Sequence, residues 1–238
     1  MRLAVFSDIH ANILALNEAL EDIEKQGCDR VYCLGDLVGY GPRPNEAIET
    51  MRRLGVPTVM GNYDDGVGYE RGDCGCAYVT EEEKQNGEKS IKWTTEQVWP
   101  DNKKYLRSLH EKIEFEADGF KVLLVHGSPR RINEYLYEDR GERSITRMLD
   151  SIDADVLVCG HTHKPYHRVV NGVNIINDGS VGKPKDGDNR ACYTVIDLDK
   201  TVSVEFKRVA YSITAVAEEI IKQGLPRAFA EALYSAGK

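Results

Sequence analysis

The sequence predicts an α/β protein in which two β-sheets have helices on their outer sides. Three features of the 238-residue chain support this fold class. The first third alternates short apolar runs with amphipathic stretches, which is typical of βαβ units and a parallel sheet. The second half is rich in strand patterns and contains two hairpin signals. A polar stretch with helical character separates the two parts.

Strands and helices alternate in the first third of the chain. The strands are predicted at residues 3–6, 31–34 and 58–60. The first helix begins after Asn12, which we interpret as an N-cap rather than a ligand contact. Its apolar residues recur at helical spacing, namely Ile13, Leu16, Leu20 and Ile23. A second helix is predicted over Pro44–Leu54.

Residues 66–111 are polar and interrupt this alternation. Two helices are predicted there, around 81–98 and 101–110, and both tryptophans, Trp93 and Trp99, lie in this stretch. We interpret the stretch as a cap-like helical insertion within a single domain that spans residues 1–238. Because it leaves the body directly after a predicted strand end, we expect it to form one wall of a substrate cleft.

The second half is predicted to be mostly β-structure. Its strands are expected at residues 112–115, 120–125, 156–159, 166–170, 173–177, 191–198 and 202–209. The dipeptides Asp118-Gly119 and Asn171-Gly172 are strong signals for tight hairpins. Helices are expected around 142–150 and from Ser212 onward. Two sheets with helices outside them are the simplest assembly of these elements.

Charge and hydropathy exclude some classes of partner. The net charge is −8, and proteins that bind nucleic acid through its phosphates usually carry a basic face, so we expect no bulk nucleic-acid partner. A small phosphorylated substrate stays possible, because bound cations reverse the local sign of a site. No apolar run approaches the roughly 20 residues needed to span a bilayer. The N-terminus reaches Asp8 too soon for a secretory signal, so we expect a cytoplasmic location.

The six cysteines lack the spacing of a disulfide framework and are expected to be reduced. Cys74-Gly75-Cys76 could supply two thiolate ligands to a metal ion, but the sequence has no matching second cysteine pair. We interpret this tripeptide as an ordinary loop.

Five predicted strands end in Asp, Asn or His, most of them beside a glycine. The five segments are Ser7-Asp8-Ile9-His10, Leu34-Gly35-Asp36, Gly61-Asn62-Tyr63-Asp64, Val125-His126-Gly127 and Gly160-His161-Thr162-His163. The carboxyl ends of strands in open α/β sheets form the ligand crevice, so these groups can converge. Each motif alone is weak, but their conjunction in one chain predicts a functional site.

The residue types in these motifs point to a metal site. Carboxylate, imidazole and carboxamide oxygen suit borderline cations such as Mn²⁺, Fe and Zn²⁺. Cysteine takes no part, which argues against a structural zinc site. The seven candidate ligands are Asp8, His10, Asp36, Asn62, His126, His161 and His163. This number is too large for one ion and suits two ions that share a carboxylate.

As an ordered set, these motifs closely resemble those of the calcineurin-like metallophosphoesterases, over residues 5–182. The stretches 35–42 and 177–182 resemble the small prokaryotic branch often labelled phosphodiesterase or diadenosine-tetraphosphatase-like. The resemblance implies an αββα sandwich of two mixed sheets with the metals at the edge of both. It also implies which residues hold each metal: Asp8, His10 and His163 the first, Asn62, His126 and His161 the second, and Asp36 both.

The cofactors are then two divalent transition-metal ions per chain, Mn²⁺ first, with Fe, Zn²⁺ or Ni²⁺ as alternatives. Asp36, Asp64 and Tyr63 are the candidate catalytic residues. Many family members have a histidine, taken as a general acid, where this chain has Tyr63. Tyrosine has an unperturbed pKa near 10 and replaces a protonated histidine poorly. We therefore favour a ring that shapes the pocket wall over acid catalysis, and Asp64 either orients a neighbouring ligand or caps a turn.

The leading function is a dinuclear-metal hydrolase that cleaves phosphoester bonds of a small phosphodiester or nucleotide-type substrate with metal-activated water. A phosphomonoesterase or protein phosphatase of the same fold is the alternative. A non-catalytic metal-binding scaffold is disfavoured, because such a protein would be expected to lose ligands, and none is missing here. Arg130 and Arg131 are interpreted as a solvated face rather than a phosphate clamp. The sequence leaves the oligomeric state open.

Overall fold

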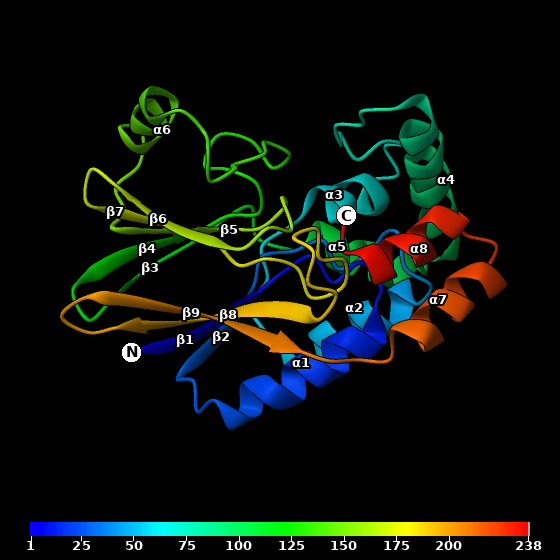
Figure 1. The fold of residues 1–238 in the computed structure, drawn as a ribbon, viewed down its shortest axis with the longest axis horizontal. Helices are drawn as coiled ribbons and strands as arrows, with labels where there is room; N and C mark the ends of the chain where they lie inside the picture. The colour runs from blue at the N-terminus through cyan, green and yellow to red at the C-terminus, as the bar shows by residue number, and fades with distance from the viewer. Residues whose placement is uncertain (238) are drawn as a thin grey trace.

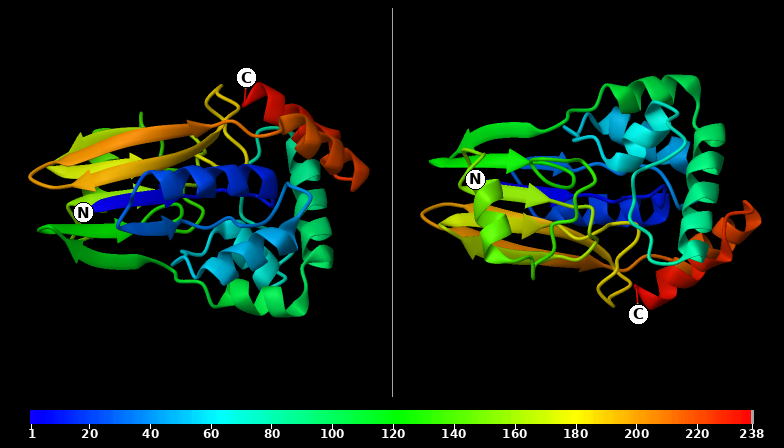
Figure 2. Two further views of the ribbon diagram at one scale, coloured as in Figure 1. Left: turned by 90° about the horizontal axis from the view of Figure 1, so that it is seen from below. Right: turned by 90° about the horizontal axis from the view of Figure 1, so that it is seen from above.

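Two mixed β-sheets form the centre of the structure, a computed structural model that describes residues 1–237 (Figures 1 and 2). The first sheet has the strand order β2-β1-β8-β9 and the second the order β3-β4-β5-β7-β6. The strands of the first sheet are β1 (Arg2–Phe6), β2 (Arg30–Cys33), β8 (Ala191–Leu198) and β9 (Val202–Val209). Those of the second are β3 (Ile113–Ala117), β4 (Phe120–Leu124), β5 (Val156–Cys159), β6 (Tyr166–Val170) and β7 (Val173–Asn177).

Helices cover the outer side of each sheet and also gather beyond one end of the two sheets (Figure 1). They are α1 (Ile13–Lys25), α2 (Pro44–Leu54), α3 (Asn62–Gly68), α4 (Glu81–Gln97), α5 (Pro100–Arg107), α6 (Glu142–Leu149), α7 (Ile213–Lys222) and α8 (Arg227–Ser235). Figure 1 shows α1 below the first sheet and α6 above the second. The predicted fold class, two mixed sheets flanked by helices, is therefore confirmed. Within the described residues, none of these helices has both the length and the apolar character needed to cross a membrane.

Alternation along the strands builds the layers. In β1, Leu3 and Val5 pack between the two sheets in one buried cluster with residues of β4, β5 and β7. Ala4 and Phe6 point the other way and join the cluster formed with α1 and α2. The second sheet uses the same period of two, because its opposite face packs against α6. Burial on both faces positions the strand ends firmly.

Parallel pairs in each sheet bring several strand ends to one edge. β1 pairs with β2 in parallel, and β4, β5 and β7 are parallel neighbours in the other sheet. The antiparallel hairpins β3-β4 and β6-β7 occur where the sequence predicts them. Asp118 and Asn171 both have positive φ, as does the glycine after each, and tight two-residue hairpins require this conformation.

One predicted strand is absent from the structure, and the helix that follows it was not predicted. Residues 58–60 form no named strand: Thr58 makes an isolated bridge to Cys33, and Val59 makes another to His110. The short extended piece lies beside β2 but turns at once into α3. That helix begins at Asn62, because the Asp64 carboxylate accepts the Gly61 backbone N–H, which is the N3 half of a capping box.

The C-terminal region, predicted only as helical, forms two helices. Gly224, with φ at +75°, and Pro226 separate α7 from α8. The helices predicted in 66–111 correspond to α4 and α5, which pack against α2 and α3. Trp93 packs against the C-terminal helices, whereas Trp99 is exposed.

Candidate metal centre

The strand ends meet at one edge shared by the two sheets. Asp8 follows β1, Asp36 follows β2, His126 follows β4 and His161 follows β5. All seven predicted ligands are buried, with at most 3% of their surface exposed. The structure places six of them in two groups of three, and the seventh, Asn62, contacts a member of the second group.

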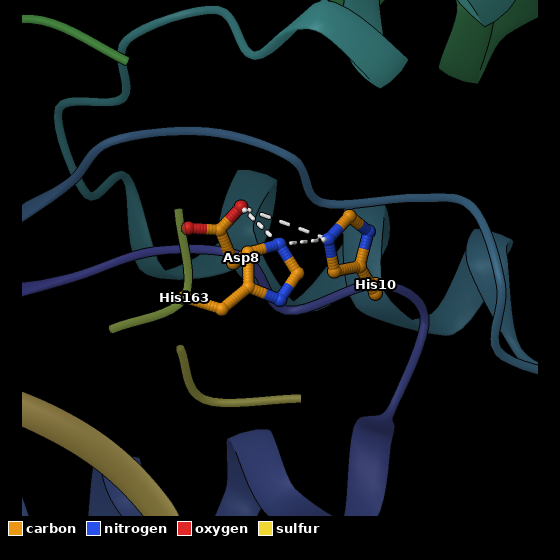
Figure 3. A group of neighbouring side chains, drawn as sticks. All are labelled: Asp8, His10 and His163. Carbon is orange, nitrogen blue, oxygen red and sulfur yellow. Dashed lines mark hydrogen bonds and ion pairs between the residues drawn. The ribbon is translucent and has the colours of Figure 1, made fainter. Parts of the chain in front are cut away.

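The first group consists of Asp8, His10 and His163 (Figure 3). The Asp8 Oδ1 atom lies 3.2 Å from His163 Nε2 and 3.6 Å from His10 Nε2. The other carboxylate oxygen, Oδ2, accepts hydrogen bonds from the Ser7 hydroxyl and from the His161 backbone N–H. Oδ1 has no hydrogen-bond partner among the described residues. The carboxylate is thus held by one oxygen and offers the other.

The two histidines of this group present lone pairs to each other. The His10 Nδ1 lies 3.0 Å from the Val38 carbonyl oxygen, and the His163 Nδ1 lies 2.5 Å from that of Lys183. A carbonyl only accepts, so each Nδ1 carries the proton and each Nε2 carries a lone pair. The two Nε2 atoms are 3.2 Å apart. Two facing lone pairs repel, and a cation between them would remove this repulsion.

The second group consists of Asp36, His126 and His161. The His126 Nδ1 donates to the Leu34 carbonyl at 2.7 Å, which leaves Nε2 as the free lone pair. This Nε2 lies 3.0 Å from Asn62 Oδ1, another atom that only accepts. His161 Nε2 is buried without a hydrogen-bond partner in the described part of the chain.

Asn62 is oriented by the loop that follows α3. Its amide nitrogen donates to the Cys74 carbonyl at 2.9 Å and to Cys76 Sγ at 3.2 Å. Both contacts fix the amide so that its oxygen points at His126. The tripeptide Cys74-Gly75-Cys76 therefore supports the site from outside, and neither cysteine belongs to the two groups found among residues 1–237.

Asp36, a member of the second group, also faces the first. Its Oδ2 is 3.7 Å from the Nε2 of His10 and 3.5 Å from that of His126. Its Oδ1 accepts the Tyr63 backbone N–H at 2.8 Å, which fixes the carboxylate plane. One oxygen of Asp36 thus faces both groups, which is the arrangement that a shared ligand requires.

Burial sets the protonation states at the site. It lowers the pKa of His10, His126 and His161 below the ordinary value near 6.5. For His163, burial and then the positive charge of Lys185 lower the pKa to about 4. The imidazoles are therefore neutral at pH 7, the state that ligates metals. Burial, followed by the nearby Asp8 and Asp64, raises the pKa of Asp36. A bound cation would stabilise the charged carboxylate of Asp36 and so offset the rise in its pKa.

Asp64 accepts hydrogen bonds from backbone N–H groups and belongs to neither group of candidate ligands. Its Oδ2 accepts the N–H groups of Asp36 and Gly61, and its Oδ1 accepts that of Leu37. Burial raises its pKa to about 6, although these backbone hydrogen bonds oppose the rise. The contacts combine the two roles left open by the sequence, because Asp64 caps α3 and also positions the loop that carries Asp36.

Tyr63 is a buried wall residue. Its side chain is fully buried, and its ring lies edge-on to the His10 ring with the centroids 5.6 Å apart. Gly39 is required beside it, since a Cβ there would fall 2.3 Å from the Tyr63 ring. Burial, then the neighbouring Tyr40, raises the Tyr63 pKa well above 10. These features favour the packing role over acid catalysis.

The backbone around the site is strained. Five predicted ligands have φ between 48° and 64°, a region that L-residues rarely adopt: Asp8, His10, Asp36, His161 and His163. Such outliers cluster at functional sites, where the surrounding structure over-determines them. Gly160 permits the close packing here, because a Cβ would lie 2.4 Å from Ser7 Oγ.

Sequence reasoning missed the pair Ser7 and Asp178. The Ser7 hydroxyl lies 2.7 Å from Asp8 Oδ2 and 2.8 Å from Asp178 Oδ1, but it has only one proton to donate. Burial, and then the charge of Asp8, raises the pKa of Asp178 well above its ordinary value. A protonated Asp178 would donate to Ser7 and so allow Ser7 to donate to Asp8. The signal was present, since Asp178 directly follows β7 at the same sheet edge.

Two secondary interpretations can be compared with the geometry. The Asn12 side chain accepts the Ala15 N–H and so caps α1, as predicted. Arg130 pairs with Glu134, but Arg130 and Arg131 also line a cavity that His126 borders, so the geometry does not favour a solvated face over a phosphate clamp. His167, which lies outside the five motifs, hydrogen-bonds Asn174 on β7 and belongs to neither group.

The fold and the buried clusters of carboxylate and imidazole define a metal-dependent hydrolase, and comparison with known proteins gives its family. Residues 1–201 match the calcineurin-like phosphoesterase superfamily domain. The chain therefore belongs to the calcineurin-like phosphoesterase superfamily, and it is a metal-dependent phosphoesterase.

Individual relatives agree with this assignment. An uncharacterized protein of Methanocaldococcus jannaschii is 36% identical over 98% of this chain and 97% of its own length. The phosphodiesterase YfcE of Escherichia coli is 26% identical and covers 84% of this chain and 89% of its own. The crystal structure of a metallophosphoesterase from Sphaerobacter thermophilus is 32% identical, with a TM-score of 0.80 over 99% of both chains.

Proposed function

We propose that this chain hydrolyses a small phosphodiester or nucleotide-type substrate at a centre of two divalent metal ions. The observation that carries the proposal is the position of Asp36, whose Oδ2 faces the free Nε2 of His10 on one side and that of His126 on the other. Mn²⁺ is the first candidate, and Fe, Zn²⁺ or Ni²⁺ are the alternatives, because the donors are mixed imidazole and oxygen.

The residues fit two cations. We assign Asp8, His10 and His163 to the first metal, Asn62, His126 and His161 to the second, and Asp36 to both. Support comes from buried atoms that lack a partner in the described residues, Asp8 Oδ1 and His161 Nε2, and from the facing acceptors His10–His163 and His126–Asn62. Each is a polar atom whose desolvation a cation would offset.

When bound, the two cations supply a water of lowered pKa and stabilise charge on the phosphoryl oxygens. The chain's own residues hold this arrangement in place. Ser7 and the His161 N–H orient Asp8, while Asp64 fixes the backbone on either side of Asp36. The carbonyls of Val38, Leu34 and Lys183 fix the histidine tautomers.

The substrate preference follows from the chain's similarity to a phosphodiesterase and from Tyr63. The ring of Tyr63 is buried and its pKa is raised, so it does not supply a proton near neutral pH. We infer that good substrates have leaving groups that need little protonation, such as aryl phosphodiesters and anhydride-linked nucleotides.

Metal analysis combined with a substrate panel tests the proposal. The protein reconstituted with Mn²⁺ should contain two ions per chain and should hydrolyse bis(p-nitrophenyl) phosphate faster than p-nitrophenyl phosphate or a phosphoserine peptide. One ion or fewer would contradict the dinuclear centre. Preference for the peptide would favour the protein phosphatase alternative, and no turnover at full metal loading would favour a scaffold.

A further inference from the structure

A cavity of about 300 Å³ lies beside the first ligand group. Pockets of this size and larger hold small molecules. Its aromatic lining comes from Tyr40, Tyr78, Tyr135 and Phe229, and its cationic lining from Lys183 and Lys185. Tyr40 connects the cavity with the site, because its ring lies edge-on to that of His10 at 4.9 Å and to that of Phe229 at 5.0 Å.

The two lysines are tethered to a predicted metal ligand. The Lys183 carbonyl accepts the His163 Nδ1–H, and the Lys185 backbone N–H donates to the His163 carbonyl. The Lys183 ammonium lies 4.3 Å above the Tyr40 ring. Both side chains therefore leave the chain next to the site, on backbone that is hydrogen-bonded to His163.

Neither lysine has an acidic partner. Within residues 1–237, neither ammonium forms an ion pair with a carboxylate, whereas six other lysines do. Glu83 also lines the cavity, but its carboxylate accepts the backbone N–H groups of Val79 and Thr80 at the start of α4. Among the described residues that line this cavity, Glu83 is the one carboxylate, so two half-buried lysines share a single negative charge there. Burial, and then the neighbouring Lys185, lowers the pKa of Lys183 to about 7, and an anionic ligand would stabilise its charged form.

The opposite wall comes from outside the matched family domain. Phe229 and two alanines of α8 line the cavity, and α8 lies beyond residue 201, where the family match ends (Figure 1). Tyr78 and Glu83 belong to the 66–111 segment. Two parts of the chain that supply no predicted metal ligand, α8 and the 66–111 segment, therefore contribute walls of the cavity. Such parts can set substrate specificity while the metal ligands stay the same.

We propose that this cavity binds the nucleoside diphosphate portion of a substrate, with Lys183 and Lys185 contacting a second phosphoryl group and the aromatic rings contacting the base. Ammonium groups bind phosphate as point charges, and aromatic faces stack with any base. The inference rests on the proposed function and names its substrate class: compounds with an aromatic base and at least two linked phosphoryl groups.

Calorimetric titration of the metal-loaded protein with AMP and with ADP tests this inference. ADP should bind at least about tenfold more tightly than AMP, since charge-assisted contacts of this kind are typically worth that factor or more. Lys183→Met and Lys185→Met keep the apolar stems and should each remove most of the difference. Phe229→Ala should weaken AMP and ADP alike but leave pyrophosphate, which has no base, unchanged.

Lys200→Met is the matched control, because Lys200 is an exposed lysine in the β8–β9 turn. Its AMP and ADP affinities should equal those of the wild type. Equal affinity of the wild type for AMP and ADP overturns the inference without any variant, so a misfolded variant does not leave it untested. The inference is also overturned if both lysine variants still prefer ADP over AMP by the same factor as the wild type. Failure to hydrolyse bis(p-nitrophenyl) phosphate would instead refute the proposed function, whatever the nucleotide affinities.

Discussion

The Nε2 atoms of His10 and His163 face each other at 3.2 Å, while the Nδ1 of each ring is bound to a backbone carbonyl. The two residues are 153 positions apart, and each has a left-handed backbone conformation. Two neutral imidazoles in this arrangement repel each other, so the fold holds a local electrostatic cost in a buried place. A cation bound by both lone pairs removes that cost, and metal binding should therefore be coupled to stability.

The first prediction concerns this coupling. Chelator treatment should lower the Tm, and Mn²⁺ should restore it, because a ligand at 100 times its Kd stabilises the folded state by about 2.7 kcal/mol. His163→Gln should lose most of the Mn²⁺-dependent rise. His167→Gln is the control, since His167 bonds Asn174 and contacts neither group. The Tm values are measured by differential scanning calorimetry. If Mn²⁺ raises the Tm of both variants equally, His163 is not a metal ligand.

The second prediction separates Asp36 from Asp64. Asp36→Asn should lower kcat/KM more than Asp64→Asn and should also reduce the bound metal, because only Asp36 faces both groups. Asp64→Asn should cost about 10–100-fold, as is typical for residues that orient ligands. Its new amide group would meet backbone N–H donors that now bond the carboxylate.

Kinetics at saturating Mn²⁺ and elemental analysis of both proteins provide the measurement. Asp65→Asn serves as the neighbouring control, because Asp65 pairs with Arg71 at the surface. Equal losses at positions 36 and 64, with full metal content in both, would mean that Asp36 does not bridge the metals.

The strand-end rule explains why the site could be predicted from the sequence. Asp8 and His126 follow buried strands, and parallel pairing brings such ends to one sheet edge whatever the loops do. The rule does not reveal contacts that depend on tertiary packing. The three N–H groups around Asp64 come from two separate loops, and the cavity rings Tyr40 and Phe229 are 189 positions apart.

Local patterns failed where tertiary pairing decides the outcome. Residues 58–60 have the composition of a strand, yet Thr58 and Val59 each find only one bridge partner. Asp178 stands at a strand end as clearly as His161 does, but it was not assigned a role, because its contact with Asp8 runs through Ser7.

The third prediction tests the wall role of Tyr63. Its hydroxyl is buried without a hydrogen-bond partner in the described residues, and an unsatisfied buried polar group costs about 1–3 kcal/mol. Tyr63→Phe removes only that oxygen, so the Tm should stay the same or rise, and kcat/KM should stay within about threefold of the wild type. General acid catalysis is typically worth about 10²–10⁴-fold. A loss of that size with aryl and alkyl esters in Tyr63→Phe would show that the hydroxyl supplies a proton.

The last prediction concerns Glu134, which anchors the loop between β4 and α6. Its carboxylate pairs with Arg130 and Arg140, and it accepts the Ser128 hydroxyl. This loop also carries Tyr135, whose ring lies 4.1 Å from that of His161. Partial burial alone would raise the pKa of Glu134, but the hydrogen bonds from Arg130, Ser128 and Arg140 outweigh it and lower the pKa to about 2.

The sign of the pH effect follows from this shift. A carboxyl whose folded pKa lies below its unfolded value near 4.5 stabilises the protein fully above pH 4.5. That contribution decreases as the pH falls below 4.5 and is lost as the pH falls through about 2. Glu134→Gln should therefore lower the free energy of unfolding at pH 7, and its difference from the wild type should shrink steadily between pH 5 and pH 3.

Urea denaturation at several pH values within this range measures the difference. Glu231→Gln is the control, because Glu231 forms an exposed pair with Arg227 within α8, and such pairs contribute about 0.3–0.5 kcal/mol. Its effect should be small at every pH. A Glu134→Gln difference that stays constant from pH 7 to pH 3 would mean that the loop is held by packing and that the arginine contacts contribute nothing through charge.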